Sequence, residues 1–427
     1  MELILGQVLQ FTNTPFDGRP EDAATHIRHG AVLVHDGTIA DVGDADTLRA
    51  QYPTAQVTDM RDALLSPGFV DTHVHYPQTA IIASWGKRLI DWLNSYTFPE
   101  ESRFGDADHA TQIAETYFDL VTAAGTTTTV SYCTIHPESV DAYFTAAQKR
   151  GLRVLGGKTC MDRNAPDNLR DTAQSAYDDS KMLLDRWHGQ DRLSYVITPR
   201  FAPTSTPEQL EALGALWAEH PDVLMQTHIS EQHEEIAWVA DLFPDAEDYL
   251  YVYEQFGLVG KGALLGHAIH LTERERDRIR ELDASLIHCP TSNMFIGSGL
   301  FDMQGLVAQG HRIGLATDTG GGSSFSMLRT MAAAYEVGQL SGKALHPAQL
   351  WWLATAGSAQ TIHMGDRIGR LAKGYEADII AVDLKSTPAI AQRTDRAATI
   401  WEALFPTIMM GDDRAISAVW AGGQKIK

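Results

Sequence analysis

The residues best suited to chemistry in this sequence are histidines and an aspartate that follow apolar, strand-like runs. His73 and His75 form an H-x-H pair, and residues i and i+2 of a strand point to the same side. His228, His267 and Asp318 lie at the ends of three later apolar runs. Imidazole nitrogens and carboxylates are ligands that zinc and iron take in proteins. Together these residues predict a site for a divalent metal ion.

Each of these residues also has a simpler explanation. A single H-x-H pair is often just a half-buried part of a strand, and an aspartate at a strand end often caps the next helix. A metal site is favoured because all of them lie at strand ends that one barrel would bring together. Glu231 follows His228 in an H-x-x-E spacing. From its position alone, Glu231 is equally a proton carrier beside the metal or a surface residue that starts the next helix.

Alternating strands and helices over the middle of the chain must position these side chains. Eight apolar runs are typical of strands: residues 69–75, 127–134, 153–162, 194–201, 224–231, 263–270, 285–293 and 311–319. Amphipathic helical patterns lie between most of them, for example at residues 109–124, 139–150, 207–220 and 325–340. This alternation predicts an α/β protein with a (β/α)8 TIM barrel of the metal-dependent hydrolase type. The alternative is an open doubly wound sheet, but neither of its usual glycine-rich phosphate loops occurs.

The two ends of the chain are rich in short strand-like runs. Four such runs stand out: residues 31–35, 38–43, 377–382 and 415–420. Asp36-Gly37, between the first two, is a dipeptide typical of a hairpin turn. Each end is too short to form a good domain alone. We therefore expect residues 1–66 and 376–427 to form one small β-sandwich domain, with residues 67–375 as the catalytic barrel.

Composition narrows the class of protein. The chain has 427 residues, and 34 Lys+Arg against 55 Asp+Glu give a net charge of −21, which would repel a nucleic acid. The three cysteines, Cys133, Cys160 and Cys289, are far apart and predict neither a disulfide framework nor a thiolate zinc site. No leader-like N-terminus and no apolar run near the roughly 18 residues of a membrane span is present. We expect a cytoplasmic protein without a nucleic-acid or membrane partner.

Longer motifs around these residues resemble those of a known family. Residues 67–75 (PGFVDTHVH) resemble the first-strand motif of the amidohydrolase superfamily, and His228, His267 and Asp318 fit the rest of its pattern. Further segments closely resemble bacterial guanine deaminases: residues 75–78 (HYPQ), 92–100 (WLNSYTFPE), 161–166 (MDRNAP), 198–204 (TPRFAPT) and 289–293 (CPTSN). The resemblance extends over essentially the whole chain, both ends included.

The resemblance implies a hydrolytic deamination of guanine at C2 that yields xanthine and ammonia. It implies these ligands for a zinc ion, with iron as the alternative: His73, His75, His228 and Asp318. The implied catalytic residues are Glu231, His267 and Asp318. Asp318 takes a proton from the attacking water, His267 hydrogen-bonds the resulting hydroxide, and Glu231 carries protons to the ring nitrogen and the leaving amino group.

The number of metal ions is predicted from a missing lysine. Amidohydrolases with two metals commonly bridge them with a carboxylated lysine at the end of the fourth strand. The fourth run here ends at residues 197–201 (ITPRF), without a lysine. Lys158 falls on the third run, where a structural role is favoured. We therefore predict one ion.

Substrate contacts are predicted from what guanine displays. Its O6 accepts hydrogen bonds and suits the fixed donors of Arg200, while the amide of Gln78 offers both a donor and an acceptor. Phe201 is placed to pack against the purine face. Trp92 comes from the long connection at residues 76–104, which is equally a pocket wall or lid, or an interface. The resemblance also implies a homodimer.

Two other functions remain open at this point. One is a related aminohydrolase that acts on another ring, such as cytosine, a triazine or an oxidised purine. The other is a metal-free barrel that serves as a binding or scaffold protein. Arg200 and Gln78 favour guanine over other rings. The presence of every metal-centre residue and of Glu231 argues against a scaffold.

Overall fold

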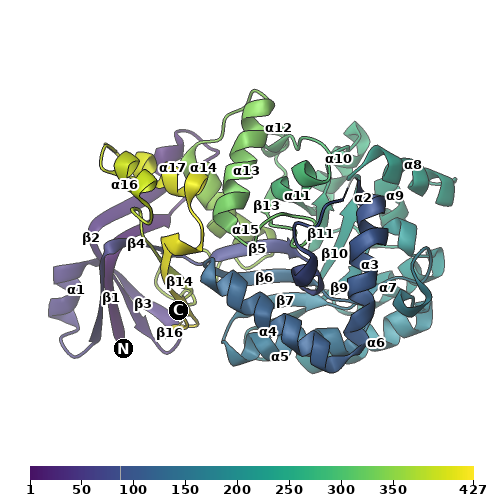
Figure 1. Ribbon diagram of the computed structural model, residues 1–427, viewed down its shortest axis with the longest axis horizontal. Helices are drawn as coiled ribbons and strands as arrows, with labels where there is room; N and C mark the ends of the chain where they lie inside the picture. The colour runs from purple at the N-terminus through teal and green to yellow at the C-terminus, as the bar shows by residue number, and fades with distance from the viewer. Residues whose placement is uncertain (87) are drawn as a thin grey trace.

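The middle of the chain folds into the expected barrel. The computed structural model describes residues 1–86 and 88–427, and in it parallel strands follow one another around an axis (Figure 1). In order, the strands are β5 (Phe69–Val74), β6 (Thr126–Tyr132), β7 (Arg153–Gly157), β9 (Leu193–Pro199), β10 (Leu224–Ile229), β11 (Ala263–His267), β12 (Ser285–His288) and β13 (Arg312–Leu315). The short strand β8 (Thr159–Cys160) pairs with β9. Each barrel strand lies within one of the eight predicted runs or overlaps it closely.

The barrel closes where β13 meets β5, through side-chain and loop hydrogen bonds. The carboxylate of Asp71 accepts hydrogen bonds from the backbone N–H of Thr317 at 3.0 Å and from its hydroxyl at 2.5 Å. The backbone N–H of Asp318 donates to the carbonyl of His73 at 3.0 Å. This seam holds the end of β13 against the end of β5, so it brings Asp318 beside the H-x-H pair.

Helices cover the outside of the barrel. They are α4 (Ala107–Ala123), α5 (Pro137–Lys149), α6 (Ala173–Trp187), α7 (Pro207–Glu219), α8 (His233–Leu242), α9 (Tyr249–Glu254), α10 (Glu273–Glu281), α11 (Pro290–Phe295), α12 (Met303–Ala308), α13 (Met327–Leu340), α14 (Pro347–Trp352) and α15 (Ser358–Thr361). Helix α7 shows why such segments become helical. Thr206 caps its first turn, Pro207 fits the first position, and Leu210 and Leu213 bury one face.

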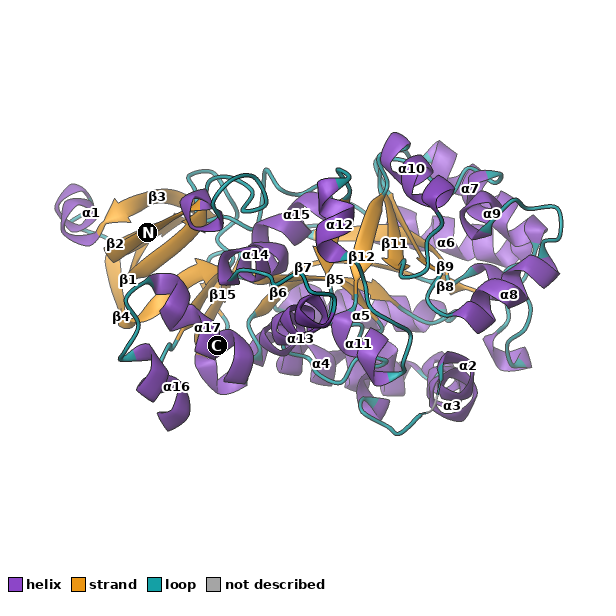
Figure 2. Cartoon of the chain, turned by 90° about the horizontal axis from the view of Figure 1, so that it is seen from above, coloured by secondary structure: helices purple, strands orange, loops and turns teal. Residues whose placement is uncertain are grey.

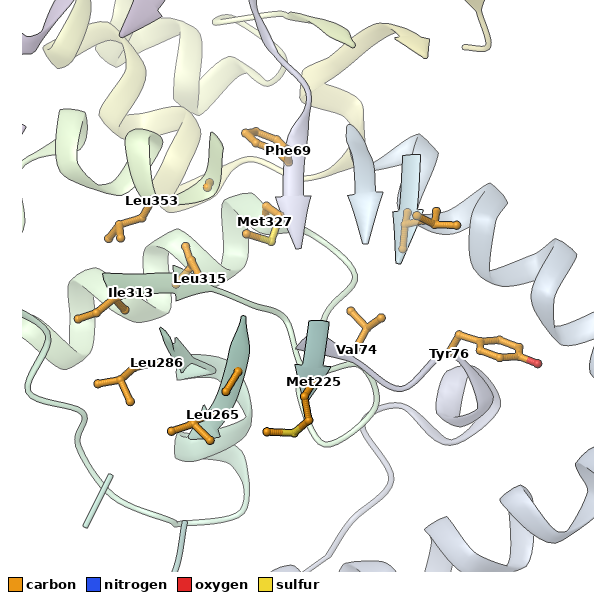
Figure 3. Packing of buried hydrophobic residues seen from close by; sticks show 14 of the residues in the cluster. Phe69, Val74, Tyr76, Met225, Leu265, Leu286, Ile313, Leu315, Met327 and Leu353 are labelled. Carbon is orange, nitrogen blue, oxygen red and sulfur yellow. The ribbon is translucent and has the colours of Figure 1, made fainter. Parts of the chain in front are cut away.

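Two apolar layers hold the barrel together. One layer fills the barrel interior with side chains such as Val70, Val130 and Leu264. The larger layer lies between strands and helices, where Figure 3 shows, among others, Leu265 of β11 and Met327 of α13. Neighbouring strand residues such as Leu264 and Leu265 thus serve opposite faces, as the period of two requires.

Both ends of the chain join one further sheet, which has seven strands. Its order is β16 (Gln424–Lys425), β15 (Ile416–Ala421), β14 (Ile379–Val382), β4 (Gln56–Pro67), β1 (Glu2–Phe11), β2 (Ala24–His35) and β3 (Thr38–Asp44). The antiparallel pairing of β14 with β4 joins the late strands to the early ones. Asp36 and Gly37 both have positive φ in the β2–β3 hairpin, as that dipeptide predicts. Figures 1 and 2 show this sheet at one end of the molecule.

The C-terminal region is more helical than its strand-like runs suggest. Between β14 and β15 lie the helices α16 (Pro388–Thr394) and α17 (Ile400–Met410), and α17 packs against α13. Thr399 caps α17, and Pro406 lies within it. Sequence patterns do not predict a helix in this apolar run, because a proline inside a run usually ends a helix. Helix α1 (Ala45–Gln51) lies in the N-terminal part of this sheet region.

The long connection after β5 consists of short helical turns. They are η2 (Tyr76–Ile81), α2 (Leu89–Trp92), the π-helical turn η3 (Leu93–Thr97), α3 (Phe98–Glu101) and η4 (Ser102–Gly105). Other short turns are η1 (Pro20–Ala23), η5 (Asp167–Leu169), η6 (Ala202–Thr204), η7 (Leu353–Gly357) and η8 (Asp413–Ala415). Within residues 1–86 and 88–427, no helix has both the length and the hydropathy that a membrane crossing requires.

Candidate active site

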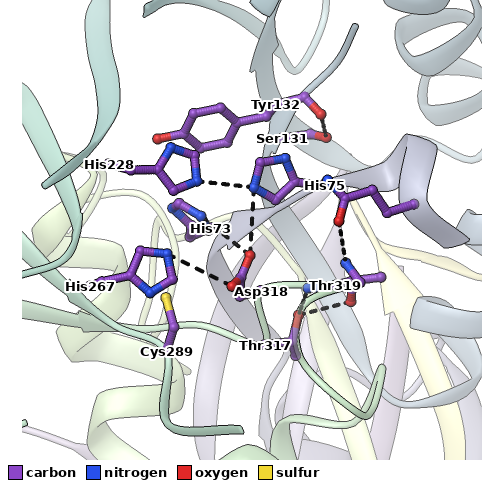
Figure 4. A network of polar contacts seen from close by, with 12 residues as sticks. His73, His75, Ser131, Tyr132, His228, His267, Cys289, Thr317, Asp318 and Thr319 are labelled. Atoms are coloured by element: carbon purple, nitrogen blue, oxygen red, sulfur yellow. Dashed lines mark hydrogen bonds and ion pairs between the residues drawn. The ribbon is translucent and has the colours of Figure 1, made fainter. Parts of the chain in front are cut away.

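Four of the residues singled out in the sequence converge at the carboxyl ends of the strands (Figure 4). The Nε2 atoms of His75 and His228 lie 3.1 Å apart. The Nε2 atoms of His73 and His75 lie 3.4 Å and 3.6 Å from Oδ1 of Asp318. Ligand atoms about 2 Å from one tetrahedral ion lie roughly 3.3 Å from each other. The ligand atoms of the three histidines lie within 4.8 Å of one another, and Asp318 contacts two of these histidines, so the cluster could hold a cation.

The protonation of the imidazoles fits a cation as well. Among the described residues, Nε2 of His73 has no hydrogen-bond partner although it is buried. His228 donates from Nδ1 to the carbonyl of Arg200 at 2.7 Å, which leaves its Nε2 free of a proton. Burial, together with neighbouring positive groups, lowers the pKa of His75 and of His228 well below its ordinary value. Neutral imidazoles are the form that binds metals.

Asp318 supplies the negative charge at this point. Burial opposes its ionisation, but the adjacent His73, whose Nε2 is 3.4 Å away, and the charge of His267 lower the pKa of Asp318 to about 2. Its φ of +49° places it in the left-handed region, which aspartate adopts more readily than most residues with side chains. The sulfur of Cys289 also lies within 4.8 Å of the ligand atoms of His73, His267 and Asp318. Cys289 begins the CPTSN motif at residues 289–293, but the sequence predicted no role for it.

His267 lies between two carboxylates. Its Nε2 is 3.6 Å from Oε2 of Glu231 and 3.8 Å from Oδ2 of Asp318. Its Nδ1 lies 2.9 Å from Oδ1 of Asn293 and donates to it, because that oxygen can only accept. Burial opposes protonation of His267, but the two carboxylates outweigh it and raise its pKa. Asn293 thus orients the ring, a role that the sequence reasoning did not assign.

Glu231 is buried and not a surface residue. The hydroxyl of Ser298 donates to its Oε1 at 2.8 Å. Burial, with the nearby carboxylates of Glu235 and Asp318, raises the pKa of Glu231 to about 7, against the opposing charge of His267. A carboxyl with a pKa near neutrality can both give and take a proton.

A pocket opens directly onto these groups. The predicted substrate-binding residues Gln78, Trp92, Arg200 and Phe201 all line it. Leu89 and Leu93, on either side of Trp92, contribute to the same wall. The connection at residues 76–104 therefore forms part of the pocket wall.

Arg200 and Gln78 share a partner that the sequence reasoning missed. Glu101, at the end of α3, accepts a hydrogen bond from Nη1 of Arg200 at 2.7 Å and one from Nε2 of Gln78 at 2.8 Å. The loop after β13 approaches Gln78 so closely that a side chain at Gly320 would lie 2.7 Å from the Gln78 carbonyl oxygen. Glycine is required there for this close approach.

Lys158 lies in an ion pair away from these groups. Its amino group is buried and bonds to the carboxylate of Asp171, whose other oxygen accepts from Gln209 at 2.6 Å. The described residues that line the pocket do not include Lys158. Its position agrees with the structural role that the sequence favoured.

Comparison with known proteins places the chain in a family. A model of the amidohydrolase family matches residues 64–426, and one of the bacterial imidazolonepropionase-like composite domain matches residues 30–55. The guanine deaminase of Escherichia coli (strain K12) is 41% identical over 430 residues, which cover 100% of this chain and 98% of that protein.

Comparison with solved structures also relates the chain to guanine deaminases. A structure of E. coli guanine deaminase has a TM-score of 0.98 at 40% identity and covers 100% of this chain and 99% of its own. A guanine deaminase from C. acetobutylicum with guanine bound in its active site has a TM-score of 0.90 at 29% identity, with 100% of both chains covered. The chain therefore belongs to the amidohydrolase family, in the group formed by the guanine deaminases.

Proposed function

We propose that this protein is an enzyme that hydrolyses guanine to xanthine and ammonia. The observation that carries the proposal is one pocket in which a buried Glu231 faces both a cation site and the ring-reading pair Gln78 and Arg200. The relatives named guanine deaminase support this assignment. So does the neighbour from C. acetobutylicum, which holds guanine in its active site.

The cation is a single zinc ion in this proposal. His73, His75, His228 and Asp318 would hold it, and it would supply a water molecule of lowered pKa. The close approach of the three histidines, the contacts of Asp318 with His73 and His75, and the lowered pKa of His75 and His228 support this assignment. A single ion is supported by Lys158, whose amino group is already paired with Asp171.

The residues around the site move the protons. Asp318 accepts a proton from the attacking water, and His267, held by Asn293, presents its Nε2 towards both carboxylates. Glu231 delivers a proton from Oε2 to the ring nitrogen beside C2 and is reprotonated by the proton that Asp318 took from the water. It passes this second proton to the amino group, which leaves as ammonia, and the hydroxyl at C2 then returns a proton to Glu231 as the carbonyl forms. The elevated pKa of Glu231, about 7, suits both transfers. Burial of the site excludes competing water from these steps.

Other residues that line the same pocket recognise the guanine ring. Arg200 and Gln78 present donors to O6 of guanine, and Gln78 also presents an acceptor to the neighbouring ring N–H. Phe201 and Trp92 line the pocket as apolar surfaces for the purine. A related aminohydrolase acting on another ring remains the alternative, since one pocket substitution can change ring choice.

The cellular setting is also a proposal. We infer that the enzyme acts as a homodimer in the cytoplasm, in the catabolism of guanine. Its three cysteines are free and buried, which agrees with a reducing compartment. Sedimentation of the purified protein tests the dimer directly.

Ammonia release from the zinc-loaded protein tests the reaction. Guanine should yield equimolar ammonia and xanthine, and a chelator should abolish the reaction until zinc is restored. Cytosine, adenine and 8-oxoguanine are measured alongside. Turnover of one of these rings without turnover of guanine would keep the hydrolytic chemistry but overturn the roles given to Gln78 and Arg200.

A further inference from the structure

A buried acid lies behind the ring-reading residues and has no place in the steps described so far. The side chain of Glu101 is 1% exposed and lies in α3, within the long connection after β5. Its Oε2 accepts from Arg200 and its Oε1 from Gln78. It lies outside the set of described residues that line the pocket, so it acts on substrate through those two partners.

Glu101 first fixes the amide of Gln78. One N–H of Nε2 is committed to Glu101, and Oε1 accepts from the backbone N–H of Gly320 at 3.4 Å. The amide therefore cannot flip without losing both bonds. One donor and one acceptor remain for the pocket, side by side. This pair matches a ring edge with a carbonyl next to an N–H, as in a 6-oxopurine.

Glu101 also balances the charge of Arg200. The guanidinium is 3% exposed, and its carbon lies 5.7 Å from the centre of the Phe98 ring. Only Nη1 bonds to Glu101 among the described contacts, so the other nitrogens remain available to the pocket. In a site with little water, an unbalanced cation would attract anions strongly. The other titratable residues that line the pocket are His75, His228, Glu231, His267 and Asp318.

We propose that Glu101 is a specificity-determining residue that makes the ring-reading side of the pocket electrically neutral. The pocket thereby binds a neutral 6-oxopurine in preference to a 6-oxopurine that has lost a ring proton. This inference rests on the proposed function. Xanthine has a ring N–H beside its new C2 carbonyl and loses a proton more readily than guanine does. Because xanthine ionises more readily, a pocket side without net charge helps the enzyme to release this product.

Glu101→Gln is the direct test, because it removes the charge and keeps the shape. In the zinc-loaded variant, kcat/KM for guanine should fall at least about tenfold. Xanthine affinity, measured by calorimetric titration, should rise by about tenfold or more between about pH 6 and about pH 9, as the ligand becomes an anion. Hypoxanthine, which lacks the second carbonyl and is the weaker acid, should show a smaller gain. The wild-type protein should bind xanthine more weakly at the higher pH.

Glu100→Gln is the matched control. Glu100 is the adjacent acid of α3 and is also largely buried, but it bonds to Arg103 at 2.8 Å and His109 at 2.9 Å and not to the pocket residues. This variant should keep the wild-type pattern of xanthine binding. A xanthine gain in both variants would mean that α3 packing, and not the Glu101 charge, sets the affinity.

A double variant covers the case in which Glu101→Gln does not fold. Glu101→Gln with Arg200→Gln removes both charges together, and replacing both partners of a buried pair is tolerated better than removing one. It should lose guanine turnover and show no rise in xanthine affinity with pH. The proposal is overturned if wild-type protein binds xanthine as tightly at the higher pH as at the lower. Binding is measured without turnover, so this result is separate from failure to deaminate guanine.

Discussion

At the scale of single residues, hydrogen-bond direction around Glu231 decides where its proton resides. Ser298 accepts a hydrogen bond from Nε2 of Gln232 at 3.1 Å and has a single proton of its own, which it donates to Oε1 of Glu231. Oε1 must therefore stay an acceptor. The acidic proton of Glu231 is directed to Oε2, the oxygen that lies 3.6 Å from His267.

Ser298→Ala tests this placement of the proton. Without the donor, the proton of Glu231 can occupy either oxygen, so fewer molecules are ready for transfer. We expect kcat for guanine to fall about tenfold, in keeping with the roughly 1.5–3 kcal/mol of a charge-assisted hydrogen bond, while KM changes little. Steady-state kinetics of xanthine formation measures both constants. Ser298→Thr keeps the hydroxyl and should restore most of kcat; equal losses in both variants would contradict the account.

The sequence predicted some residues of the site and not others, and the difference has a physical reason. His73 and His75 are two residues apart on a strand, so their spacing alone shows a shared direction. Ser298 reaches Glu231 across 67 residues and Glu101 reaches Arg200 across 99. Contacts between such distant positions depend on the packing of whole loops, which no local pattern encodes.

At the scale of elements, the seam between β5 and β13 positions the cation site. Asp71 binds both the backbone and the hydroxyl of Thr317, one residue before Asp318. The neighbouring Thr72 also crosses the seam and donates to the carbonyl of Leu315 at 3.1 Å. Successive strand residues face opposite sides. Asp71 thus bonds to the segment that carries Asp318, whereas Thr72 bonds two residues earlier, at the end of β13.

Asp71→Ala should therefore weaken metal binding. Loss of the support behind a ligand typically costs 10- to 100-fold in metal affinity, and we expect a loss of at least about tenfold here. Competition with a chelator of known zinc affinity measures it. Thr72→Val is the matched control, because it removes a bond of the same seam and should lower stability with little effect on zinc. Equal zinc affinity in Asp71→Ala and wild type would show that the seam does not position Asp318.

The regular elements were the most predictable part of the fold. The barrel strands follow the apolar runs because buried parallel strands are apolar on both faces. The connection at residues 76–104 left a choice between pocket wall and interface, since its short turns have no sustained period. The structure places Leu89, Trp92 and Leu93 in the pocket wall.

At the scale of the whole molecule, a buried network of charges joins the barrel to the sheet. Glu376, which precedes β14, bonds to Arg153 of β7 at 2.5 Å and 2.6 Å and to Arg192 at 2.6 Å and 2.9 Å. Arg192 also bonds to Asp378. Burial opposes ionisation of Glu376, but the bonds and charges of the two arginines outweigh it and lower its pKa.

The free energy of unfolding should therefore depend on Glu376, and its contribution should decrease as the pH falls. Because the folded pKa lies below the unfolded value, the stabilisation is complete above the unfolded pKa of about 4.5 and is lost as pH falls through the folded pKa. Glu376→Gln should lower the free energy of unfolding by about 3 kcal/mol at neutral pH, and by less in acid. Urea unfolding at both pH values measures this. A deficit that stays constant with pH would contradict it.

The general architecture was predictable, and part of its detail was not. Strand–helix alternation predicted the barrel, and strand-like runs at both ends predicted one small β-sandwich domain. The pairing of β14 with β4 joins both ends in one seven-stranded sheet. The predicted boundaries at residues 66 and 376 stay a prediction. Helix α17 was missed because its apolar composition and internal Pro406 obscure the helical period.

Glu231 is inferred to transfer protons during guanine deamination in this pocket. The most direct measurement is xanthine formation by zinc-loaded wild type and Glu231→Gln, with the zinc content of both determined on the same samples. This role of Glu231 predicts that the wild type forms xanthine and that the variant retains zinc but turns guanine over at least about a thousandfold more slowly. A variant that holds zinc and still forms xanthine at a rate near that of the wild type would contradict it.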